Sequence, residues 1–553
     1  MKRKLSFLLA AMMILAVLSA CGGGGTTTTT AGDATTAAAA GTSAATTAAA
    51  ATTVPANDSN MADNQVLVVR LAGDPMTFQP NTIGDDFAYG PVQNIYNRLV
   101  KLDASKQIIP DLARTWETSA DGLHITFHLA ENVVWHDGTP FTSADVKYTF
   151  DTIRTTSEYF ASFYMENVAS IDCPDDNTVI FNMSEPDVAV IGYLGWYGTF
   201  ILPQHLFDNG QGWDDNPVSE KPIGTGPFKF EKYTPTVSIE LVKNENYWDC
   251  DVILDKVIYQ LIPDDATSVQ ALRTGEIDMM EGAPVSEGEA LKAEGFNVEV
   301  NVYPSPYYFY FNWRNGKETP DAVRQAIALC INREDINAKV FGNVREPEYN
   351  FYPSVVEWAS SDAAKAPDYN IEAAIQVLED AGLTKDANGF YYSLQVECYS
   401  VDGAPDVCTL ISAECKKAGI NLTVNAQEYL AWNNTVDRYS GPGTFDMSMS
   451  GGFQGPDPAA LSNRVGTDGA SNGGYYSNPE IDALFKEALT NSDQAYRQER
   501  YFKIQEMLRD DLAIIPIISY AGYDVSGGNI VNTPLQCVGI TGWAEYSRTY
   551  IGK

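Results

Sequence analysis

The sequence contains few of the residues and short motifs on which common catalytic sites depend. It has four histidines in 553 residues, no His-Glu-x-x-His zinc-binding helix, no P-loop and no EF-hand loop. The segment GTGPF at residues 224–228 begins like a dinucleotide-binding loop but lacks the third glycine. His124 and His128 fall in HITFHL, whose alternation predicts a strand with both histidines facing away from the core. We therefore expect no enzyme activity, no metal site and no cofactor.

Closely spaced cysteine pairs and an excess of basic charge are also missing. Beyond Cys21, the remaining cysteines are at positions 173, 250, 330, 398, 408, 415 and 537, and no Cys-x-x-Cys pair occurs. Zinc ribbons and thioredoxin-like chemistry are therefore not expected, although an oxidising compartment would permit a disulfide. The net charge of -36 at pH 7 and the pI near 4.3 argue against nucleic acid and anionic lipid headgroups as partners.

The N-terminal segment has the arrangement of an export signal. The basic residues 2–4 precede an apolar run over residues 5–18. This run is too short to span a membrane as a helix, and no later apolar stretch approaches that length. The ending Leu-Ser-Ala-Cys at 18–21 resembles the bacterial lipobox, which implies cleavage before Cys21 and acylation of its thiol. We expect residues 1–20 to be a lipoprotein signal peptide; the alternative is an ordinary cleaved signal followed by an incidental cysteine.

The segment behind Cys21 has a composition that cannot build a core. Residues 22–65 are nearly all Gly, Thr, Ala and Ser and include no aromatic residue. Such a segment cannot offset the conformational entropy lost on ordering. We expect residues 21–65 to be the lipidated cysteine and a disordered linker. The rest of the chain, residues 66–553, is too long for one hydrophobic core, so two or three domains are expected.

Segments with strand and helix periodicity alternate through this folded part. VLVVRLA at 66–72 and AIIPIISYAGYDV at 513–525 are typical of buried strands. Thr142, followed three residues later by Asp145, predicts the capped start of a helix. Helix patterns also occur from residue 371 and from residue 479. The pattern predicts a mixed α/β fold.

Several long motifs occur in a fixed order and resemble one family. They are PDLARTWETSADGLHITFHLAENVVWHDGTPFTSADVKYTFD at 110–151, GTGPFKFEKYTPTVSIELVKNENYW at 224–248, AVRQAIALCINREDI at 322–336, GFQGPDPAALSNRV at 452–465 and GYYSNPEIDALFKEAL at 474–488. Together they resemble the family 5 extracellular solute-binding proteins, which are the oligopeptide, dipeptide and nickel receptors of ABC importers. With the lipobox, the resemblance covers essentially the whole mature chain.

The resemblance implies a two-lobed α/β fold of the periplasmic-binding-protein type that closes about a hinge. Lobe 1 would comprise residues 66–305, with an extra subdomain at about 101–200, and lobe 2 residues 306–514. Residues 515–553 would return to lobe 1. The tyrosine-rich segment PYYFYFNW at 306–313 would then lie near a crossover between the lobes.

The function implied is that of a lipid-anchored receptor which captures an extracellular solute and delivers it to an ABC permease. It would lie outside the cytoplasm, on the outer face of a bacterial plasma membrane or on the periplasmic side. We expect a monomer that touches the membrane only through its lipid. The solute would be a peptide or a similar small polar molecule, and an oligosaccharide is the alternative. An extracellular hydrolase or a cell-wall protein is the rival from another class.

The positions that match the family imply a pocket of aromatic and polar side chains. The candidates are Asp85, Asp86, Phe87, Tyr159, Phe160, Tyr307, Tyr308, Trp432, Phe453, Gln454 and Tyr520. For each of them, ordinary core or surface packing is the alternative. Peptide-binding members carry an aspartate that pairs with the peptide's α-amine where this chain has Phe453-Gln454-Gly455. Because Gln454 is uncharged, we do not expect it to hold a charged α-amine.

The lipobox reading predicts how the protein partitions in cells. Cys21→Ser should release the chain from the membrane fraction or leave its signal uncleaved, because acyl chains supply the stable anchor. Fractionation followed by immunoblotting measures this, and circular dichroism of the variant should match that of the parent protein. Undiminished membrane retention of Cys21→Ser would contradict the prediction.

Overall fold

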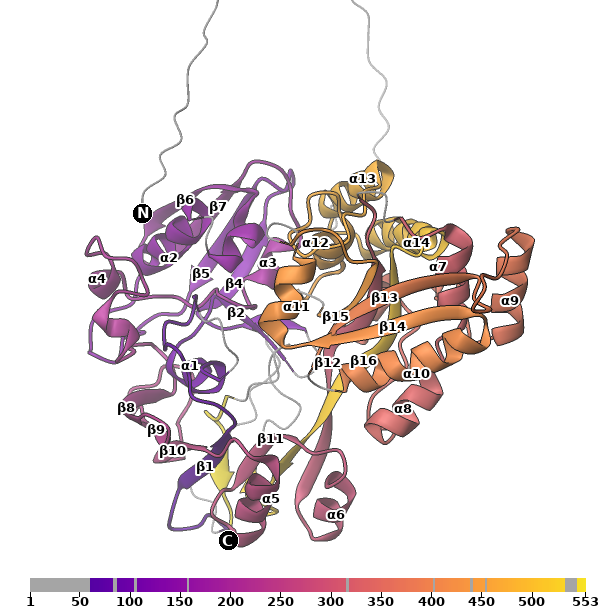
Figure 1. Ribbon diagram of the computed structural model, residues 1–553. Helices are drawn as coiled ribbons and strands as arrows, with labels where there is room; N and C mark the ends of the chain where they lie inside the picture. Colours follow the sequence, from indigo (N-terminus) through magenta and orange to yellow (C-terminus); the bar gives the residue numbers. More distant parts are fainter. Residues whose placement is uncertain are drawn as a thin grey trace, which may run out of the picture. The chain divides into compact units, whose positions relative to one another are not determined.

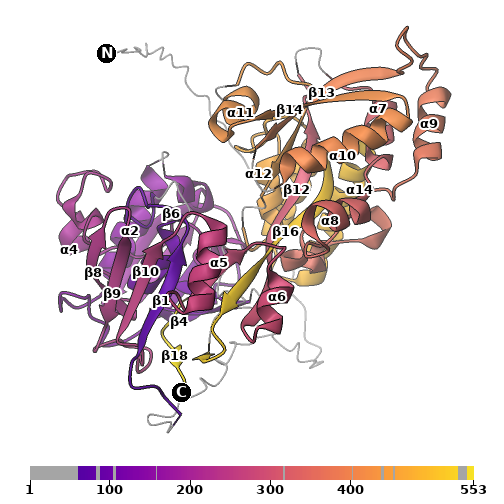
Figure 2. The ribbon, with the colours of Figure 1, turned by 60° about the horizontal axis from the view of Figure 1, so that its bottom comes forward.

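The computed structural model describes residues 60–82, 87–103, 107–156, 159–314, 318–400, 403–437, 441–452, 455–532 and 545–553 (Figures 1 and 2). The predicted signal peptide and Cys21 lie outside these residues, as does nearly all of the predicted linker. Of the candidate pocket residues, Asp85, Asp86, Phe453 and Gln454 also lie outside them, and so does the side chain of Phe160.

The fold is built on a ten-stranded mixed sheet with the order β14-β13-β15-β12-β16-β11-β1-β10-β9-β8. The order is far from sequential, because strands from both halves of the chain are joined into one sheet. Its members are β1 (Val66–Leu71), β8 (Phe228–Thr234), β9 (Ser238–Lys243), β10 (Lys256–Leu261), β11 (Met279–Ala283), β12 (Asn297–Phe311), β13 (Tyr392–Tyr399), β14 (Ile420–Gln427), β15 (Met447–Gly451) and β16 (Ile514–Ser526).

Two long antiparallel strands, β12 and β16, lie side by side in this sheet (Figures 1 and 2). They connect two groups of strands: β14, β13 and β15 form one group, and β11, β1, β10, β9 and β8 form the other. Their pairing runs from Asn297 opposite Ser526 to Tyr310 opposite Ile514. At one end β16 pairs with β11, and at the other end β12 pairs with β15. The register shifts twice in between, around Tyr307. Such shifts bend and twist a ladder locally, so the strands change direction where they pass from one group to the other.

A second sheet has four antiparallel strands in the order β4-β5-β7-β6 and packs against helix α2. The predicted strand over HITFHL is confirmed as β5: Ile125 and Phe127 are buried, while His124 and His128 are exposed. The predicted capping box is confirmed at the start of α2. These elements are β4 (Ala113–Thr118), β5 (His124–Leu129), β6 (Val168–Asp175), β7 (Thr178–Met183) and α2 (Ser143–Thr155).

The remaining helices cover the sheets or fill the connections between strands (Figure 1). None of the helices in the described residues is long and apolar enough to cross a membrane. The α-helices are α1 (Tyr89–Ile95), α3 (Val190–Tyr193), α4 (Gln204–Phe207), α5 (Asp265–Thr274), α6 (Gly288–Ala293), α7 (Asp321–Leu329), α8 (Arg333–Phe341), α9 (Ile371–Asp380), α10 (Ala404–Lys417), α11 (Tyr429–Val436), α12 (Ser462–Val465), α13 (Pro479–Leu489) and α14 (Gln494–Asp511).

Short elements complete the chain. The 3₁₀-helices are η1 (Phe160–Met165), η2 (Pro217–Ser219), η3 (Ser354–Ala359), η4 (Asp362–Ala364) and η5 (Pro458–Leu461), and the short strands are β2 (Val100–Leu102), β3 (Ile108–Pro110), β17 (Ile530–Val531) and β18 (Tyr550–Ile551). The end of the chain returns to its folded start, because the Gln65 side chain donates to the Ile551 carbonyl (2.9 Å) and accepts from the Ile551 amide (2.9 Å).

The GTGPF segment has a packing role. A side chain at Gly224 would place its Cβ 1.9 Å from the carbonyl oxygen of Ile95, and one at Gly226 would lie 2.6 Å from the same atom. The Gly226 amide donates to that oxygen (2.8 Å). Only glycine permits two backbones to approach this closely. Burial lowers the pKa of the adjacent His136 to about 4, so its imidazole is neutral. The close approach of the two backbones makes the segment a close-packed junction.

Residues 345–348 add a short edge to β16. The Ser519 amide donates to the Glu346 carbonyl (2.9 Å), and the Glu348 amide donates to the Ile517 carbonyl (3.1 Å). The Glu348 side chain is buried, where it accepts from the Asn350 amide (3.0 Å) and from the Ser519 hydroxyl (3.1 Å). Burial raises the pKa of this carboxyl to about 7.

This raised pKa predicts a pH-dependent loss of stability. The carboxyl has a pKa of about 4.3 in an unfolded chain. Between these two values the folded state holds a proton that the unfolded state has released. The free energy of unfolding should therefore fall as pH rises from about 4 to about 7, on the order of 3 kcal/mol from this group. Glu348→Gln should remove this part of the fall, as measured by denaturant unfolding at pH 5 and pH 8.

The control is Glu346→Gln, since Glu346 is exposed on the same segment. It should keep the parent protein's dependence on pH. An identical loss of stability between pH 5 and pH 8 in Glu348→Gln and the parent protein would contradict the assignment.

Candidate functional site

Five aromatic side chains meet where β12 and β16 pass between the two groups of strands. The Tyr307 ring lies 4.6 Å from that of Tyr520 and 6.4 Å from that of Tyr399, while the Tyr399 ring lies 4.9 Å from that of Trp432. Tyr429 contacts both Tyr399 and Trp432. We call these five residues the aromatic cluster. Edge-to-face packing of this kind fixes the rings relative to one another.

The cluster also has a hydroxyl network. The Tyr520 hydroxyl donates to that of Tyr307 (2.7 Å) and lies 3.4 Å from that of Tyr399. The Trp432 indole N–H donates to the Ser448 hydroxyl (3.0 Å), which in turn donates to the backbone carbonyl of Glu397 (3.0 Å). The apolar faces and the polar groups are therefore held in one arrangement, which suits a site that needs both.

Each member is positioned by a different element. Tyr307 and Tyr520 stand on β12 and β16 beside the register shift. Tyr399 ends β13, and Tyr429 begins α11, whose N-cap Glu428 accepts from the first turn. Tyr307, Tyr399 and Trp432 are buried, but Tyr429 is 56% exposed. The cluster is thus a fixed aromatic wall with one edge open to solvent.

Two buried arginines flank the cluster. The Arg345 guanidinium carbon lies 4.5 Å from the ring centroid of Tyr520 and 5.6 Å from that of Tyr307. Arg464 donates from Nη2 to the carbonyl of Gly451 (2.7 Å), the residue paired with Tyr307 on β15, and its guanidinium carbon lies 5.7 Å from the ring centroid of Tyr308. Burial lowers the pKa of Arg464. Within the described part of the chain, neither guanidinium forms an ion pair with a carboxylate.

The structure brings together three of the residues that the sequence predicts, Tyr307, Trp432 and Tyr520. Tyr308 points elsewhere, since its side chain is fully buried and its hydroxyl donates to the Phe351 carbonyl (3.2 Å). Tyr159 belongs to another aromatic group, where it stacks on Trp213 with ring centroids 4.6 Å apart.

Of the other predicted residues, only Phe87 has a side chain in the described part of the chain, where it is 39% exposed. Sequence reasoning missed three residues of the site: Tyr399, Tyr429 and Arg345. The spacing of Tyr429, one helical turn before Trp432, could have indicated it. No local pattern marks Arg345.

One short segment of the sequence matches the motif around the nucleophile of a class of hydrolases. Residues 469–473 read Gly-Ala-Ser-Asn-Gly, which fits the nucleophile-elbow pattern, but they form a loop between α12 and α13 and do not follow a strand. The four histidines contact residues between 117 and 226, so none serves as a base for Ser471. In the described residues there is also no group of three potential metal ligands.

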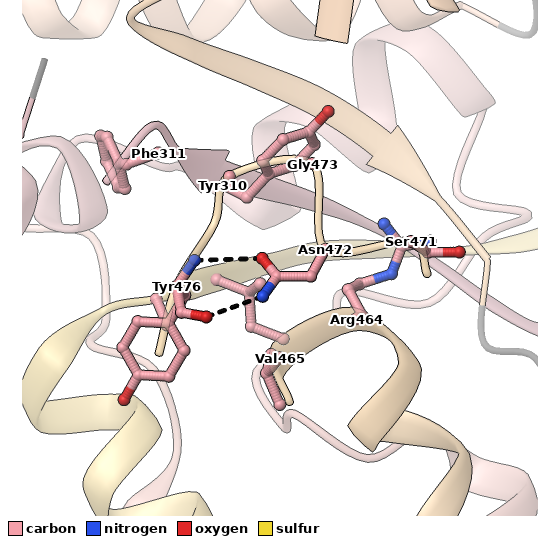
Figure 3. Close-up of a pocket in the computed structure, with 11 residues that line it drawn as sticks. Tyr310, Phe311, Arg464, Val465, Ser471, Asn472, Gly473 and Tyr476 are labelled. Carbon is pink, nitrogen blue, oxygen red and sulfur yellow. Dashed lines mark hydrogen bonds between the residues drawn. The ribbon is translucent and has the colours of Figure 1, made fainter. Parts of the chain in front are cut away.

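The same loop borders a small cavity (Figure 3). Asn472 braces it by donating to the carbonyls of Gly466 (2.9 Å) and Tyr476 (2.7 Å) and accepting from the Tyr476 amide (3.1 Å). The cavity volume is about 10 Å³, close to the minimum for one water molecule. The residues that line it therefore pack beside Arg464, and the cavity is too small for a solute.

The Pro-Asp-Pro turn and the described cysteines are structural as well. Asp457 accepts from the Ala459 amide (2.9 Å) and pairs with Arg497 (2.6 Å). The cysteines at 173, 250, 330, 398, 408 and 415 are unpaired thiols; Cys537 lies outside the described residues.

Comparison with known proteins places this geometry in a family. The family model described as "Bacterial extracellular solute-binding proteins, family 5 Middle" matches residues 107–473. A putative ABC transporter peptide-binding protein of Brucella ovis is 31% identical over 72% of this chain and 76% of its own length.

Solved structures show the same fold. The substrate-binding protein CtaP of Listeria monocytogenes matches with a TM-score of 0.79 at 24% identity, over 89% of this chain and 100% of its own. DppA of Helicobacter pylori, solved with the peptide STSA, matches with a TM-score of 0.73 at 25% identity, over 89% of this chain and 99% of its own. The two-lobed fold is therefore that of these binding proteins, and the chain belongs to family 5 of the bacterial extracellular solute-binding proteins.

Proposed function

We propose that the protein is a receptor that captures a peptide outside the cytoplasm and passes it to the permease of an ABC transporter. The observation that carries this is the aromatic cluster, which combines fixed ring faces and tyrosine hydroxyls at one place. The relative from Brucella ovis is named as a putative peptide-binding protein and the protein from Helicobacter pylori was solved with a peptide, and both favour a peptide as the ligand here.

The pairing of the strands in the large sheet supports a division into two lobes. Lobe 1 would comprise residues 66–305 and 515–553, with the extra subdomain at about 101–200, and lobe 2 residues 306–514. β12 and β16 then contain the hinge, since both strands run between the two groups of strands. A hinge needs few connections, and two strands with a shifted register supply them. A peptide that contacts both lobes would favour the closed arrangement.

The receptor would be held at the membrane by the lipid on Cys21, with residues 22–65 as its tether. Asp85, Asp86, Phe87, Phe453 and Gln454 stay predicted contributors from loops near the ligand, beside the aromatic cluster. Tyr159 and Phe160 would contribute only if the ligand reaches the extra subdomain. The protein would act as a monomer, since one chain supplies the whole site.

An oligosaccharide is the second candidate ligand. The observation in its favour is the pair of rings on α11, where the exposed Tyr429 lies 5.6 Å from Trp432 at an angle of 38°. Flat aromatic faces of this kind stack on sugars as readily as on peptide side chains. The identity of the bound solute distinguishes the two.

Native mass spectrometry of the protein as purified tests the proposal. We expect one peptide per chain, released intact on unfolding. Tyr429→Ala should weaken its binding about tenfold, the effect of losing one or two aromatic contacts, without lowering the melting temperature of the unliganded protein. Tyr369→Ala is the matched control, because Tyr369 is also exposed but contacts Glu414 on α10; it should leave binding unchanged.

Two results would contradict the proposal. One is turnover of the bound peptide, which would indicate a hydrolase. The other is a bound oligosaccharide in place of a peptide, which would establish the second candidate.

A further inference from the structure

We propose that Arg345 binds a carboxylate of the ligand, so that the receptor selects peptides with an acidic group beside the aromatic cluster. This inference rests on the proposed function and adds the charge of the ligand to it. It is carried by the environment of one buried guanidinium, two of whose nitrogens have no hydrogen-bond partner among the described residues.

Arg345 is a buried cation that pairs with no carboxylate among the described residues. The residue is 8% exposed, and its Nε and Nη1 atoms have no hydrogen-bond partner among the described residues. No carboxylate there forms an ion pair with it, although the chain has 72 acidic residues and 36 basic ones. An uncompensated buried charge is costly, and proteins normally pair it.

Arg333 shows how this fold treats an arginine with a structural role. It is fully buried, but it donates to the carbonyls of Glu348 (2.8 Å), Pro516 (2.6 Å) and Pro367 (3.1 Å). Its donors therefore fasten the segment after α8 to β16. Among the described residues, the Nε and Nη1 atoms of Arg345, on that same segment, make no such bonds, so they do not anchor the backbone.

The backbone around Arg345 fixes where its guanidinium lies. Residues 346 and 348 hydrogen-bond to residues 517 and 519 of β16. Side chains alternate along such a ladder: Glu348 contacts Ser519 on one side, while Arg345 lies over Tyr520 on the other. Glu348 therefore does not neutralise Arg345.

The rings around Arg345 compensate its charge only in part. Its guanidinium carbon is 3.9 Å from the ring centroid of Phe341 and 4.5 Å from that of Tyr520. Cation–π contacts at these distances are favourable, but they leave the donors on Nε and Nη1 without an acceptor among the described residues. A carboxylate accepts two parallel bonds from a guanidinium, which a ring cannot do.

Paired peptide libraries test the inference. The probes are a mixed tripeptide library with free carboxyl termini and the same library with amidated termini, and the retained peptides are read by mass spectrometry. The parent protein should bind carboxylate members about ten- to a hundredfold more tightly than their amides. Retention of amidated members that carry Asp or Glu would show that a side-chain carboxylate fills the site, and it would support the inference equally.

The variants separate binding from packing. Arg345→Gln should weaken the carboxylate peptides about ten- to a hundredfold and leave carboxylate-free amides unchanged, so that the preference disappears. Lys292→Gln removes one charge from an exposed position on α6. It should leave the affinity for the carboxylate peptides and for the carboxylate-free amides unchanged. Equal binding of carboxylate-containing peptides and carboxylate-free amides by the parent protein, or equal losses for both in Arg345→Gln, would overturn the inference.

A measurement without ligand completes the test. Arg345→Met should keep or raise the melting temperature of the unliganded protein, because it removes an unpaired buried charge; a lower melting temperature would indicate a structural role and overturn the inference. If neither library binds, the proposed peptide receptor fails, and the melting comparison still decides whether Arg345 is built for an anion.

Discussion

The antiparallel pairing of β12 with β16 is the interaction on which the rest of the structure depends. It joins the strands near β1 to those near β13 in one sheet. It also places Tyr307 beside Tyr520, although 213 residues separate them in the chain. The register shift around Tyr307 allows the ladder to bend there. The connection between the two groups of strands and the arrangement of the aromatic cluster therefore depend on the same few residue pairs.

The segment 345–348 also takes its position from β16. Because it pairs with β16, its two faces have opposite electrostatic roles. Burial raises the pKa of the Glu348 carboxyl on one face, which makes that group neutral over much of the acid range. The guanidinium of Arg345 on the other face lies against the ring of Tyr520 in the aromatic cluster. A binding protein tolerates such a local cost in stability where the ligand later compensates it.

Local patterns predicted much of the fold. The alternation in HITFHL gave β5 with the correct buried face, and Thr142 with Asp145 gave the start of α2. Both depend on neighbours within a few residues, where periodicity and capping are strong signals.

The site was predictable only in part, because its members come from distant segments. The family resemblance indicated Tyr307, Trp432 and Tyr520, and the structure brings them together. It also indicated Tyr308, whose hydroxyl bonds instead to Phe351. Arg345 carries no local signal, since its lack of partners depends on how residues 345–348 pair with β16. The two glycines of GTGPF likewise depend on the distant backbone of Ile95.

The central claim is that a solute binds at the aromatic cluster and draws together the two groups of strands that β12 and β16 connect. Small-angle X-ray scattering with and without a saturating solute measures this most directly. The account predicts a smaller radius of gyration in the bound state. An unchanged scattering profile with a solute confirmed to be bound would contradict it.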